Sequence, residues 1–292
     1  MTRRPLRIAT RGSALARWQA ERVAALLRDT QAGADLGAEL VIVETSADRR
    51  LDVPIEAMGG KGVFVKEVQA AVLDGSADLA VHSAKDLPST TIAGLSLAAV
   101  PERGDPRDAL VGSTLEALPQ GATVATGSAR RRVQLRERRP DLRFEGLRGN
   151  MQTRLDKAAG YDAIVVAAVA LERLGLDDQI AEILPVEVLL PQVGQGALAV
   201  ECSADDSELL RVLAAIEHPA SRRCVDAERA FLAELGGDCT LPAGAHATAG
   251  GDGTLTVSGL LEVDGRVRRA AKSGTDGLAT GAEVARMLRD GG

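Results

Sequence analysis

Residues 190–201 read LPQVGQGALAVE, and this stretch decides the topology that we expect for the chain. It opens with a break at 190–196 that contains proline and glycine. It continues into an apolar run, 197–201, that is typical of a buried strand. A complete α/β unit ends just before the break. We therefore expect the strand to rejoin a sheet that began earlier, so that the preceding unit is an inserted domain reached by a double crossover. Three unrelated domains in a row are the alternative.

Outward from this stretch, towards the N-terminus, short apolar runs alternate with helical patterns. The expected strands are 6–10, 40–44, 78–82, 122–126 and 161–167, and the expected helices are 13–29, 63–73, 128–138 and 150–159. A polar break at 101–106 separates the two halves of the pattern. This alternation predicts parallel or mixed sheets with helices on both faces, and a cleft between two lobes in which a ligand would bind.

Towards the C-terminus the pattern changes near residue 221. A helix is expected to about 235, followed by a loop at 236–242, strands at 244–249, 255–263 and 267–273, and a last helix at 278–289. This is the pattern of a small α+β domain. The expected domains are 1–100 together with 197–218, an inserted domain at 104–194, and a C-terminal domain at 219–292.

The composition narrows the class of protein. With 45% hydrophobic and 26% charged residues the chain has the balance of a globular protein, and its net charge of -6 argues against a broad surface for nucleic acid. No apolar run opens the chain as in a signal peptide, and none is long enough to span a membrane. The three cysteines have neither pairing nor metal-ligand spacing, which favours a reducing cytoplasm.

Most of the basic residues are arginines: the chain has thirty arginines and five lysines. Two explanations of this excess of arginine are open. Either the genome favours arginine codons, or the protein has a site that binds carboxylates, with which a guanidinium group forms two parallel hydrogen bonds. Several of these basic groups, with hydroxyl partners, follow the expected strands: Arg11 with Ser13, Lys85, Ser128 with Arg130 and Arg131, and Arg148 with Arg154. Taken together, these residues predict a pocket for a molecule with several carboxylates. Taken one at a time, each group is also explained as the capped, solvent-exposed start of a helix.

Two further residues carry reactive chemistry. Asp86 follows an expected strand and could hydrogen-bond an ammonium or pyrrole N–H and stabilise positive charge there, although a turn that faces water is the alternative. Cys239 lies in a glycine-containing loop, where its thiolate would be an accessible nucleophile. Cys202 falls in an apolar strand and Cys224 in a helix, where the role of a small buried hydrophobe is expected instead.

These segments resemble the ordered motifs of the porphobilinogen deaminases, also called hydroxymethylbilane synthases. The matching stretches are 7–13 with 18–19, 59–67, 78–88, 105–109, 147–155, 161–164, 194–197 and Cys239. The resemblance covers about residues 6–246, and such a series in one order is far more specific than any single motif. It implies a cytoplasmic monomeric transferase with two lobes like those of a periplasmic binding protein, and a third domain that carries the cofactor cysteine.

The resemblance also implies the chemistry and its residues. Four porphobilinogen molecules would lose ammonia in turn and join head to tail on one dipyrromethane cofactor, held by a thioether to Cys239, without a metal. Asp86 corresponds to the catalytic residue that contacts pyrrole nitrogens. Cofactor contacts are implied for Lys85, Asp86, Ser128, Arg130 and Arg131, and substrate contacts for Arg11, Ser13, Gln19, Lys61, Phe64, Arg148, Arg154, Arg173 and Gln195.

The chain departs from the usual family motifs at a few positions. Ala125, Gly127 and Ala129 alter the segment around Ser128, and Asp238 precedes the cysteine where a glycine is common. A neighbouring carboxylate would raise the pKa of the Cys239 thiol. Two rival functions use the same cleft: a two-lobed module that binds or senses a small polyanion, and a different transferase for carboxylate substrates. Product analysis with porphobilinogen separates both rivals from the deaminase function.

Overall fold

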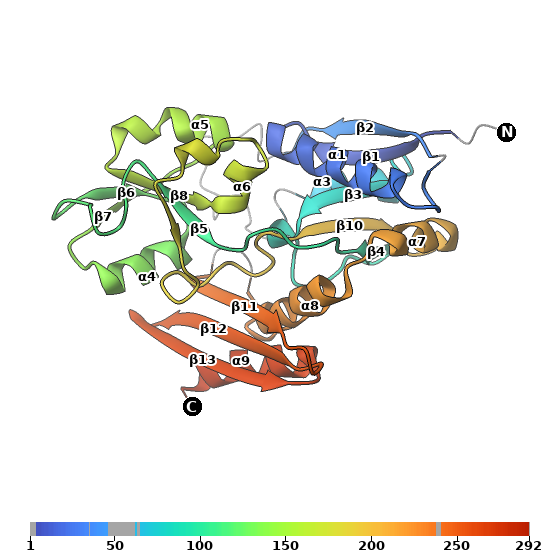
Figure 1. Ribbon diagram of the computed structural model, residues 1–292. Coiled ribbons are helices and arrows are strands. Elements are labelled where there is room, and N and C mark those ends of the chain that lie inside the picture. The colour runs from blue at the N-terminus through green and yellow to red at the C-terminus, as the bar shows by residue number, and fades with distance from the viewer. Residues whose placement is uncertain (1–3, 35, 46–61, 63–64, 238–240, 292) are drawn as a thin grey trace. The chain divides into compact units, whose positions relative to one another are not determined.

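A computed structural model describes residues 4–34, 36–45, 62, 65–237 and 241–291 (Figure 1). The chain forms two compact units. The first contains Met1–Arg103 and Ala197–Arg222, and the second contains Gly104–Gly196 and Arg223–Gly292. Each unit is therefore built from two stretches of chain that are distant in sequence.

The first unit contains a mixed five-stranded sheet. Its strands, in spatial order, are β2 (Ala38–Val43), β1 (Leu6–Arg11), β3 (Leu79–Ser83), β10 (Leu198–Ser203) and β4 (Leu95–Ala99). Strand β1 is parallel to both β2 and β3, whereas β10 is antiparallel to β3 and β4. The apolar run after residue 196 thus rejoins a sheet that began at residue 6, which confirms the predicted double crossover.

Helices cover both faces of this sheet. Because successive side chains of a strand point to opposite faces, Ile8 and Ala9 enter different cores. Ile8 packs in one core with Val23 of α1 (Ala14–Arg28) and Leu213 of α7 (Ser207–Leu213). Ala9 packs in the other core with Val68 of α3 (Lys66–Leu73). Because β1 and β3 are parallel neighbours, their carboxyl ends lie side by side at one edge of a sheet that helices cover on both faces.

The second unit contains a mixed sheet with an equivalent order of strands. The order is β7 (Arg143–Glu145), β6 (Thr123–Ala125), β8 (Ala163–Ala167), β5 (Asp108–Val111) and β9 (Glu182–Leu184). Strand β6 is parallel to β7 and β8, and β5 is antiparallel to β8 and β9. In each sheet, then, the fourth position is taken by the strand that directly follows a crossover.

Helices α4 (Ala129–Arg138), α5 (Met151–Asp156) and α6 (Ala168–Glu172) accompany this sheet. Leu135 of α4 packs with Val124 and Val165 in one core, and Leu171 of α6 packs with Ile164 in the other. The helix predicted at 150–159 is wrong in length, since α5 ends at Asp156 and a separate 3-10 turn, Ala158–Gly160, follows. Strands β4, β5, β7 and β9 and helices α6 and α7 were not predicted, because runs of three to seven residues carry too little periodicity.

A three-stranded antiparallel sheet completes the second unit. Its strands are β11 (Ala243–Ala249), β12 (Leu255–Val263) and β13 (Arg266–Gly274), with helices α8 (Pro219–Glu234) and α9 (Gly277–Asp290). Phe231 and Val284 pack over Gly259 of β12, where an added Cβ would lie 2.7 and 2.6 Å from their side chains. Glycine at this position therefore lets both helices approach the sheet closely. The predicted division at 100/104, 194/197 and 218/219 stays a prediction.

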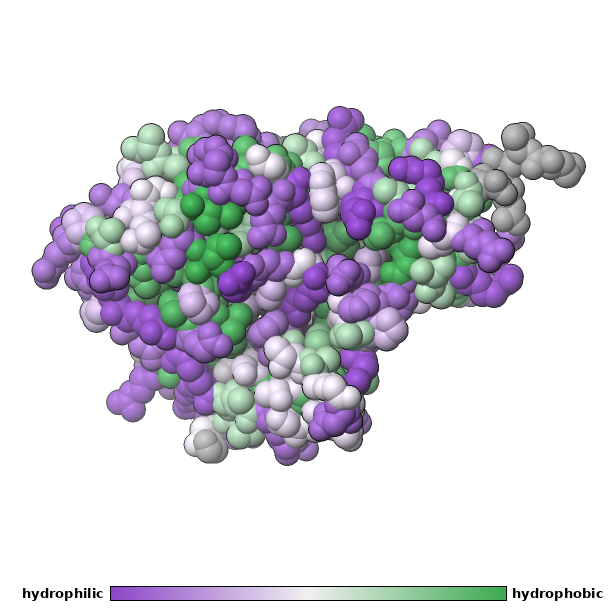
Figure 2. Space-filling model, in the orientation of Figure 1, coloured by the Kyte–Doolittle hydropathy of each residue, from purple (hydrophilic) through white to green (hydrophobic). Residues whose placement is uncertain are grey.

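Polar residues cover most of the surface that Figure 2 displays, as the charged fraction of the sequence leads one to expect. Within the described ranges, none of the helices combines the length and the apolar character needed to cross a bilayer.

Candidate functional site

A pocket opens in the first unit at the carboxyl ends of β1 and β3. Its polar lining includes five of the residues singled out from the sequence: Arg11, Ser13, Gln19, Lys85 and Asp86. His82 and Ser83 also line it, together with apolar atoms of Leu15, Val65 and Val81. The open α/β sheet therefore gathers its chemistry at the edge where such sheets commonly bind ligands.

Local structure explains how these side chains are presented. Arg11 ends β1, and Ser13 caps α1 by accepting a hydrogen bond from the backbone N–H of Ala16 at 3.2 Å. Asp86 lies in a short 3-10 turn, Ala84–Asp86, directly after β3. The backbone N–H of Ala84 donates to the carbonyl of Ala197 at 3.0 Å, so the start of the returning strand supports this turn. The crossover that decides the topology thus also supports the segment that carries Asp86.

Behind this pocket lies a buried polar group that sequence reasoning gave no role. Glu201 of β10 is 2% exposed, and its Oε2 accepts a hydrogen bond from Nε2 of Gln69 at 2.8 Å. The same oxygen lies 3.2 Å from Nε2 of His82, which finds no hydrogen-bond partner in the described part of the chain. The contact is therefore an ion pair when His82 is protonated, and it lies off the hydrogen-bond direction. A lone glutamate inside the apolar run ALAVE was the available signal.

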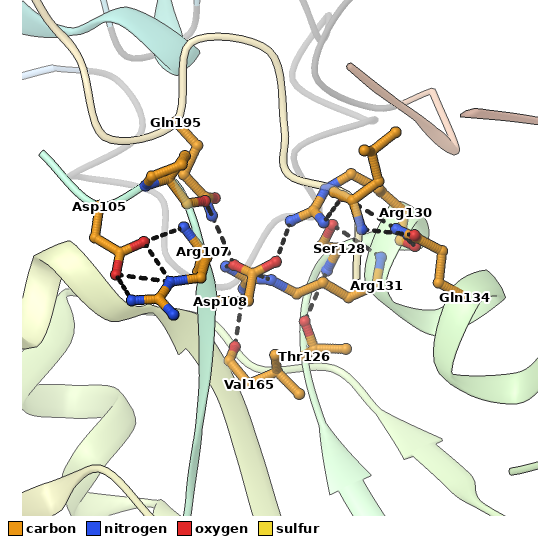
Figure 3. Close-up of polar contacts among 12 residues, drawn as sticks. Asp105, Arg107, Asp108, Thr126, Ser128, Arg130, Arg131, Gln134, Val165 and Gln195 are labelled. Carbon is orange, nitrogen blue, oxygen red and sulfur yellow. Dashed lines mark hydrogen bonds and ion pairs between the residues drawn. The ribbon is translucent and has the colours of Figure 1, made fainter. Parts of the chain in front are cut away.

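A second cluster lies in the second unit around Asp108, the first residue of β5 (Figure 3). Asp108 is fully buried and accepts hydrogen bonds from Nη2 of Arg130 at 2.8 Å and from Nη2 of Arg131 at 2.6 Å. Nε of Arg131 and Nε2 of Gln195 also donate to Oδ1, at 3.2 and 2.9 Å. One carboxylate therefore holds two guanidinium groups and one amide in fixed positions.

Charge governs the protonation of this cluster. Burial by itself raises the pKa of Asp108, but the charges of Arg130 and Arg131 and their hydrogen bonds hold that pKa well below the usual carboxyl range. Burial lowers the pKa of Arg130, and the neighbouring Asp108 opposes this effect. Asp108 is thus a carboxylate at any physiological pH. The sequence motif contained it, but nothing in the spacing indicated that it meets two arginines.

Backbone contacts orient both arginines further. Arg130 donates through Nη1 to the carbonyl of Leu190, and Arg131 donates through Nη1 to the carbonyl of Val165 at 2.8 Å. Ser128 caps α4 by accepting from the backbone N–H of Arg131 at 3.4 Å. Ser128, Arg130 and Arg131 are therefore brought together, as their shared helix start predicts, but the arginines are already engaged by the protein.

The other sequence-predicted residues of the second unit are placed as follows. Gln195 is fully buried against Asp108, and Arg173 donates to the carbonyl of Gly196 at 2.6 Å. Burial lowers the pKa of Arg173 to about 10. Arg154 donates through Nε to the carbonyl of Gly149 at 2.9 Å, and Arg148 is half-buried in the loop between β7 and α5. Gln195 consequently supports the cluster instead of lining an open surface.

Three sequence-predicted residues, Lys61, Phe64 and Cys239, lie outside the described residues. Cys202 and Cys224 are both buried, which confirms the burial predicted for them. The described ranges contain no group of three or more acidic, histidine or cysteine side chains that could hold a metal ion.

Two family models match the chain across both units. The model of the porphobilinogen deaminase dipyrromethane cofactor binding domain matches residues 6–211, and that of the porphobilinogen deaminase C-terminal domain matches residues 222–290. The chain belongs to the porphobilinogen deaminase family. The family's first domain model is named for the dipyrromethane cofactor, so the chain contains that cofactor-binding domain.

Relatives with this name match nearly the whole chain. The porphobilinogen deaminase of Roseiflexus castenholzii is 47% identical over 297 residues, which cover 99% of this chain and 97% of the relative. That of Chromobacterium violaceum is 48% identical over 294 residues, 98% of this chain and 94% of the relative. The deaminase assignment therefore applies to all of the units described above.

Similar solved structures are distant by comparison. A YaeC-family lipoprotein from Enterococcus faecalis has a TM-score of 0.41 and 14% identity, and covers 74% of this chain and 92% of its own. A periplasmic binding protein from Salmonella typhimurium with high arginine specificity has a TM-score of 0.40 and 13% identity, and covers 73% and 92%. At these TM-scores the similarity supports no conclusion about this chain, and the fold description rests on its own strand orders.

The polar clusters of this deaminase-family chain suit a ligand rich in carboxylates. In the second unit two guanidinium groups face a single carboxylate, so one positive charge is left in excess within a buried cluster. A buried excess charge is costly unless an opposite charge comes to it. In the first unit Arg11 and Lys85 add two cations to a pocket that also holds Asp86. Both arrangements fit the acidic side chains of a dipyrromethane group.

Proposed function

We propose that the chain is a transferase that deaminates porphobilinogen and joins four units head to tail into hydroxymethylbilane, the precursor of haem and other tetrapyrroles. The observation that carries this proposal is the pocket that gathers Asp86 with Arg11, Ser13, Gln19 and Lys85. It combines one carboxylate with cations and hydrogen-bond donors at the end of a sheet. Family membership supplies the reaction class, and the pocket supplies groups suited to it.

The role that we assign to Asp86 follows from charge. Loss of ammonia from porphobilinogen leaves an electron-poor, positively charged pyrrole, and a fixed carboxylate beside its nitrogen lowers the energy of that state. Asp86 lies in a turn held by backbone hydrogen bonds, so it does not have to reorganise during the reaction. Arg11 and Lys85 would bind acidic side chains of the reacting rings, and Ser13 and Gln19 would add hydrogen bonds.

Residues of the second unit would hold the cofactor and the growing chain. We assign cofactor contacts to Ser128, Arg130 and Arg131, and substrate contacts to Arg148, Arg154, Arg173 and Gln195. Dipyrromethane, when bound through a thioether to Cys239, supplies the pyrrole carbon to which the first new unit is joined. Lys61 and Phe64 complete the proposed substrate contacts.

We also propose that the protein works as a cytoplasmic monomer that binds neither nucleic acid nor a membrane. Three cysteines without pairing or metal-ligand spacing suit a reducing compartment. The net charge of -6 disfavours a broad nucleic-acid surface. Sedimentation of the purified protein would test the monomer, and a single species at twice the chain mass would overturn it.

Intact mass tests the central proposal. The purified chain and its Cys239→Ser variant are weighed before and after incubation with porphobilinogen, and Ehrlich's reagent reports attached pyrroles. We expect an excess mass of two linked pyrrole units in the parent chain and none in the variant, with hydroxymethylbilane released only by the parent. If neither an adduct nor a product forms, the transferase proposal fails. A module that binds a small polyanion would then take its place.

A further inference from the structure

The cluster around Asp108 contains more cation than its own carboxylate can neutralise. Arg130 is 2% exposed and Arg131 is 6% exposed, while Asp108 has no exposed surface. Asp108 bonds both guanidinium groups, so the trio carries one net positive charge. Its carboxylate is too small to use all of the N–H groups of two guanidiniums, each of which has five. Nε of Arg130 is buried and has no partner among the described residues.

Asp108 also belongs to the chain crossing. It stands at the start of β5, where the chain first enters the second sheet. Gln195, on the returning segment, donates through Nε2 to Oδ1 of Asp108 at 2.9 Å and to the carbonyl of Pro106 at 2.6 Å. Arg130 and Gln134 both donate to the carbonyl of Leu190 on that same segment. The guanidinium groups are therefore held in place from both crossing segments of the second unit (Figure 3).

We propose that Asp108, supported by Gln195, is the positioning residue that fixes the guanidinium groups of Arg130 and Arg131 so that together they accept one carboxylate of the pyrrole ligand. This inference rests on the proposed function. Because Asp108 neutralises one of the two charges, the pair presents a single excess charge to the ligand. Because it bonds Nη2 of both arginines and Nε of Arg131, it also decides which N–H groups remain for the ligand.

The test compares three variants of the full chain: Asp108→Asn, Asp108→Glu and the control Asp105→Asn. Asp105 lies in the same crossing segment and pairs with Arg107, which is 44% exposed, but it does not contact Arg130 or Arg131. In Asp108→Asn the shape is kept and the negative charge is lost. We expect cofactor loading, measured by intact mass, to fall at least threefold and kcat to fall at least tenfold. KM for porphobilinogen should change less than threefold, because the guanidinium groups of Arg130 and Arg131, which lose their position in this variant, hold the cofactor.

The glutamate variant separates positioning from folding. Asp108→Glu keeps the charge but displaces the carboxylate, so we expect a folded protein with kcat between those of the parent and of Asp108→Asn. Asp105→Asn should match the parent in loading, kcat and KM. Parent-like loading and kcat in a folded Asp108→Asn variant overturn the proposal. If that variant does not fold, parent-like kcat in Asp108→Glu overturns it.

A second readout does not depend on turnover. The Cys239→Ser chain, alone and combined with Asp108→Asn or Asp105→Asn, is unfolded thermally in sodium acetate and in sodium chloride of equal ionic strength. Acetate is the simplest carboxylate, and a ligand that binds the folded state raises Tm. The quantity compared is the Tm in acetate minus the Tm in chloride. We expect this difference to change when Asp108→Asn is added and to stay the same when Asp105→Asn is added. An identical acetate effect in all three proteins contradicts the proposal. If the parent chain neither gains the adduct nor consumes porphobilinogen, the proposed function fails separately.

Discussion

Oε2 of Glu201 lies 3.2 Å from Nε2 of His82, both side chains are almost completely buried, and His82 lines the pocket that contains Asp86. The two residues come from adjacent strands, β10 and β3, that are 119 positions apart in sequence only because a whole α/β lobe is inserted between them. Gln69 of α3 bonds the same carboxylate oxygen. The crossover therefore brings Glu201 of β10 against residues of β3 and α3.

Glu201→Gln is the first change that follows from this contact. It removes the charge opposite His82 and leaves buried polar groups imperfectly paired, which costs about 1–3 kcal/mol. We expect this loss in the free energy of unfolding, measured by urea denaturation, and a lower kcat because His82 lines the pocket. Glu208→Gln, at an exposed position in the first turn of α7, is the matched control. Equal stability and kcat in the two variants would show that the buried contact is unimportant.

Asp86→Asn keeps the size of the side chain but removes the negative charge from the pocket. Removing one preorganised group that stabilises developing charge typically lowers kcat by about 100-fold or more. Because Asp86 is half-buried in a surface turn, stability should change by no more than about 0.5 kcal/mol. Porphobilinogen consumption and thermal unfolding measure the two effects. Asp29→Asn, at the exposed C-terminal cap of α1, serves as the control, and parent-like turnover in Asp86→Asn would remove Asp86 from its assigned role.

Gly196→Ala tests the close approach of the two crossing segments. Gly196 has φ 89°, and an added Cβ would lie 2.5 Å from the carbonyl oxygen of Gly104 and 2.9 Å from that of Asp105. Gly175→Ala is a matched control, because Gly175 has φ 66° but has no atom within 4 Å of the added Cβ. We expect the control to lose about 1–2 kcal/mol from backbone strain alone.

For Gly196→Ala we expect a further loss of about 1–3 kcal/mol, since rigid backbone must shift to admit the methyl group. Urea denaturation of both variants gives the difference. Equal losses in the two variants would mean that the crossing segments can separate freely at this point.

Acid stability reports on Asp108. Its folded-state pKa is held below the unfolded value of about 3.9, so its stabilising contribution is complete above that pH and is lost as the pH falls through the folded pKa. The free energy of unfolding should therefore fall less steeply below pH 4 in Asp108→Asn than in the parent, by at most about 1.4 kcal/mol per pH unit. Urea denaturation at pH 5, 4 and 3 measures the slopes. Identical slopes would contradict the assignment of the charge to Asp108.

Thiol labelling tests the buried cysteines. Burial raises the pKa of the Cys202 thiol to about 11, so at pH 8 it is not a reactive thiolate, and Cys224 is shielded from the reagent by burial. In the Cys239→Ser variant we expect no iodoacetamide adduct on the native protein and two adducts after denaturation, as read by intact mass. Rapid labelling of the native variant would show that one of these helices or strands opens readily.

Much of the architecture was predictable because it depends on local patterns. Period-two and period-3.6 alternation located the longer strands and helices, and strand 255–263 was predicted with its observed bounds. Polar residues after apolar strands located Arg11 and Asp86, since the carboxyl ends of parallel strands share one edge of a sheet. Strands β5, β7 and β9 of the second sheet, each of three or four residues, escaped prediction. Their stability comes from the neighbours with which they pair, and local sequence does not encode those neighbours.

The sequence by itself determined the family of this protein, the order of its elements and the residue types that line its pocket. Only the tertiary structure decided which charges meet. Asp108 at the start of β5 joins Arg130 and Arg131 of α4, and Glu201 of β10 joins His82 of the adjacent strand β3, because the fold brings together residues that are distant in sequence. The energy of such a contact depends on distance and burial, which arise from the assembled sheet and leave no periodic trace in the chain.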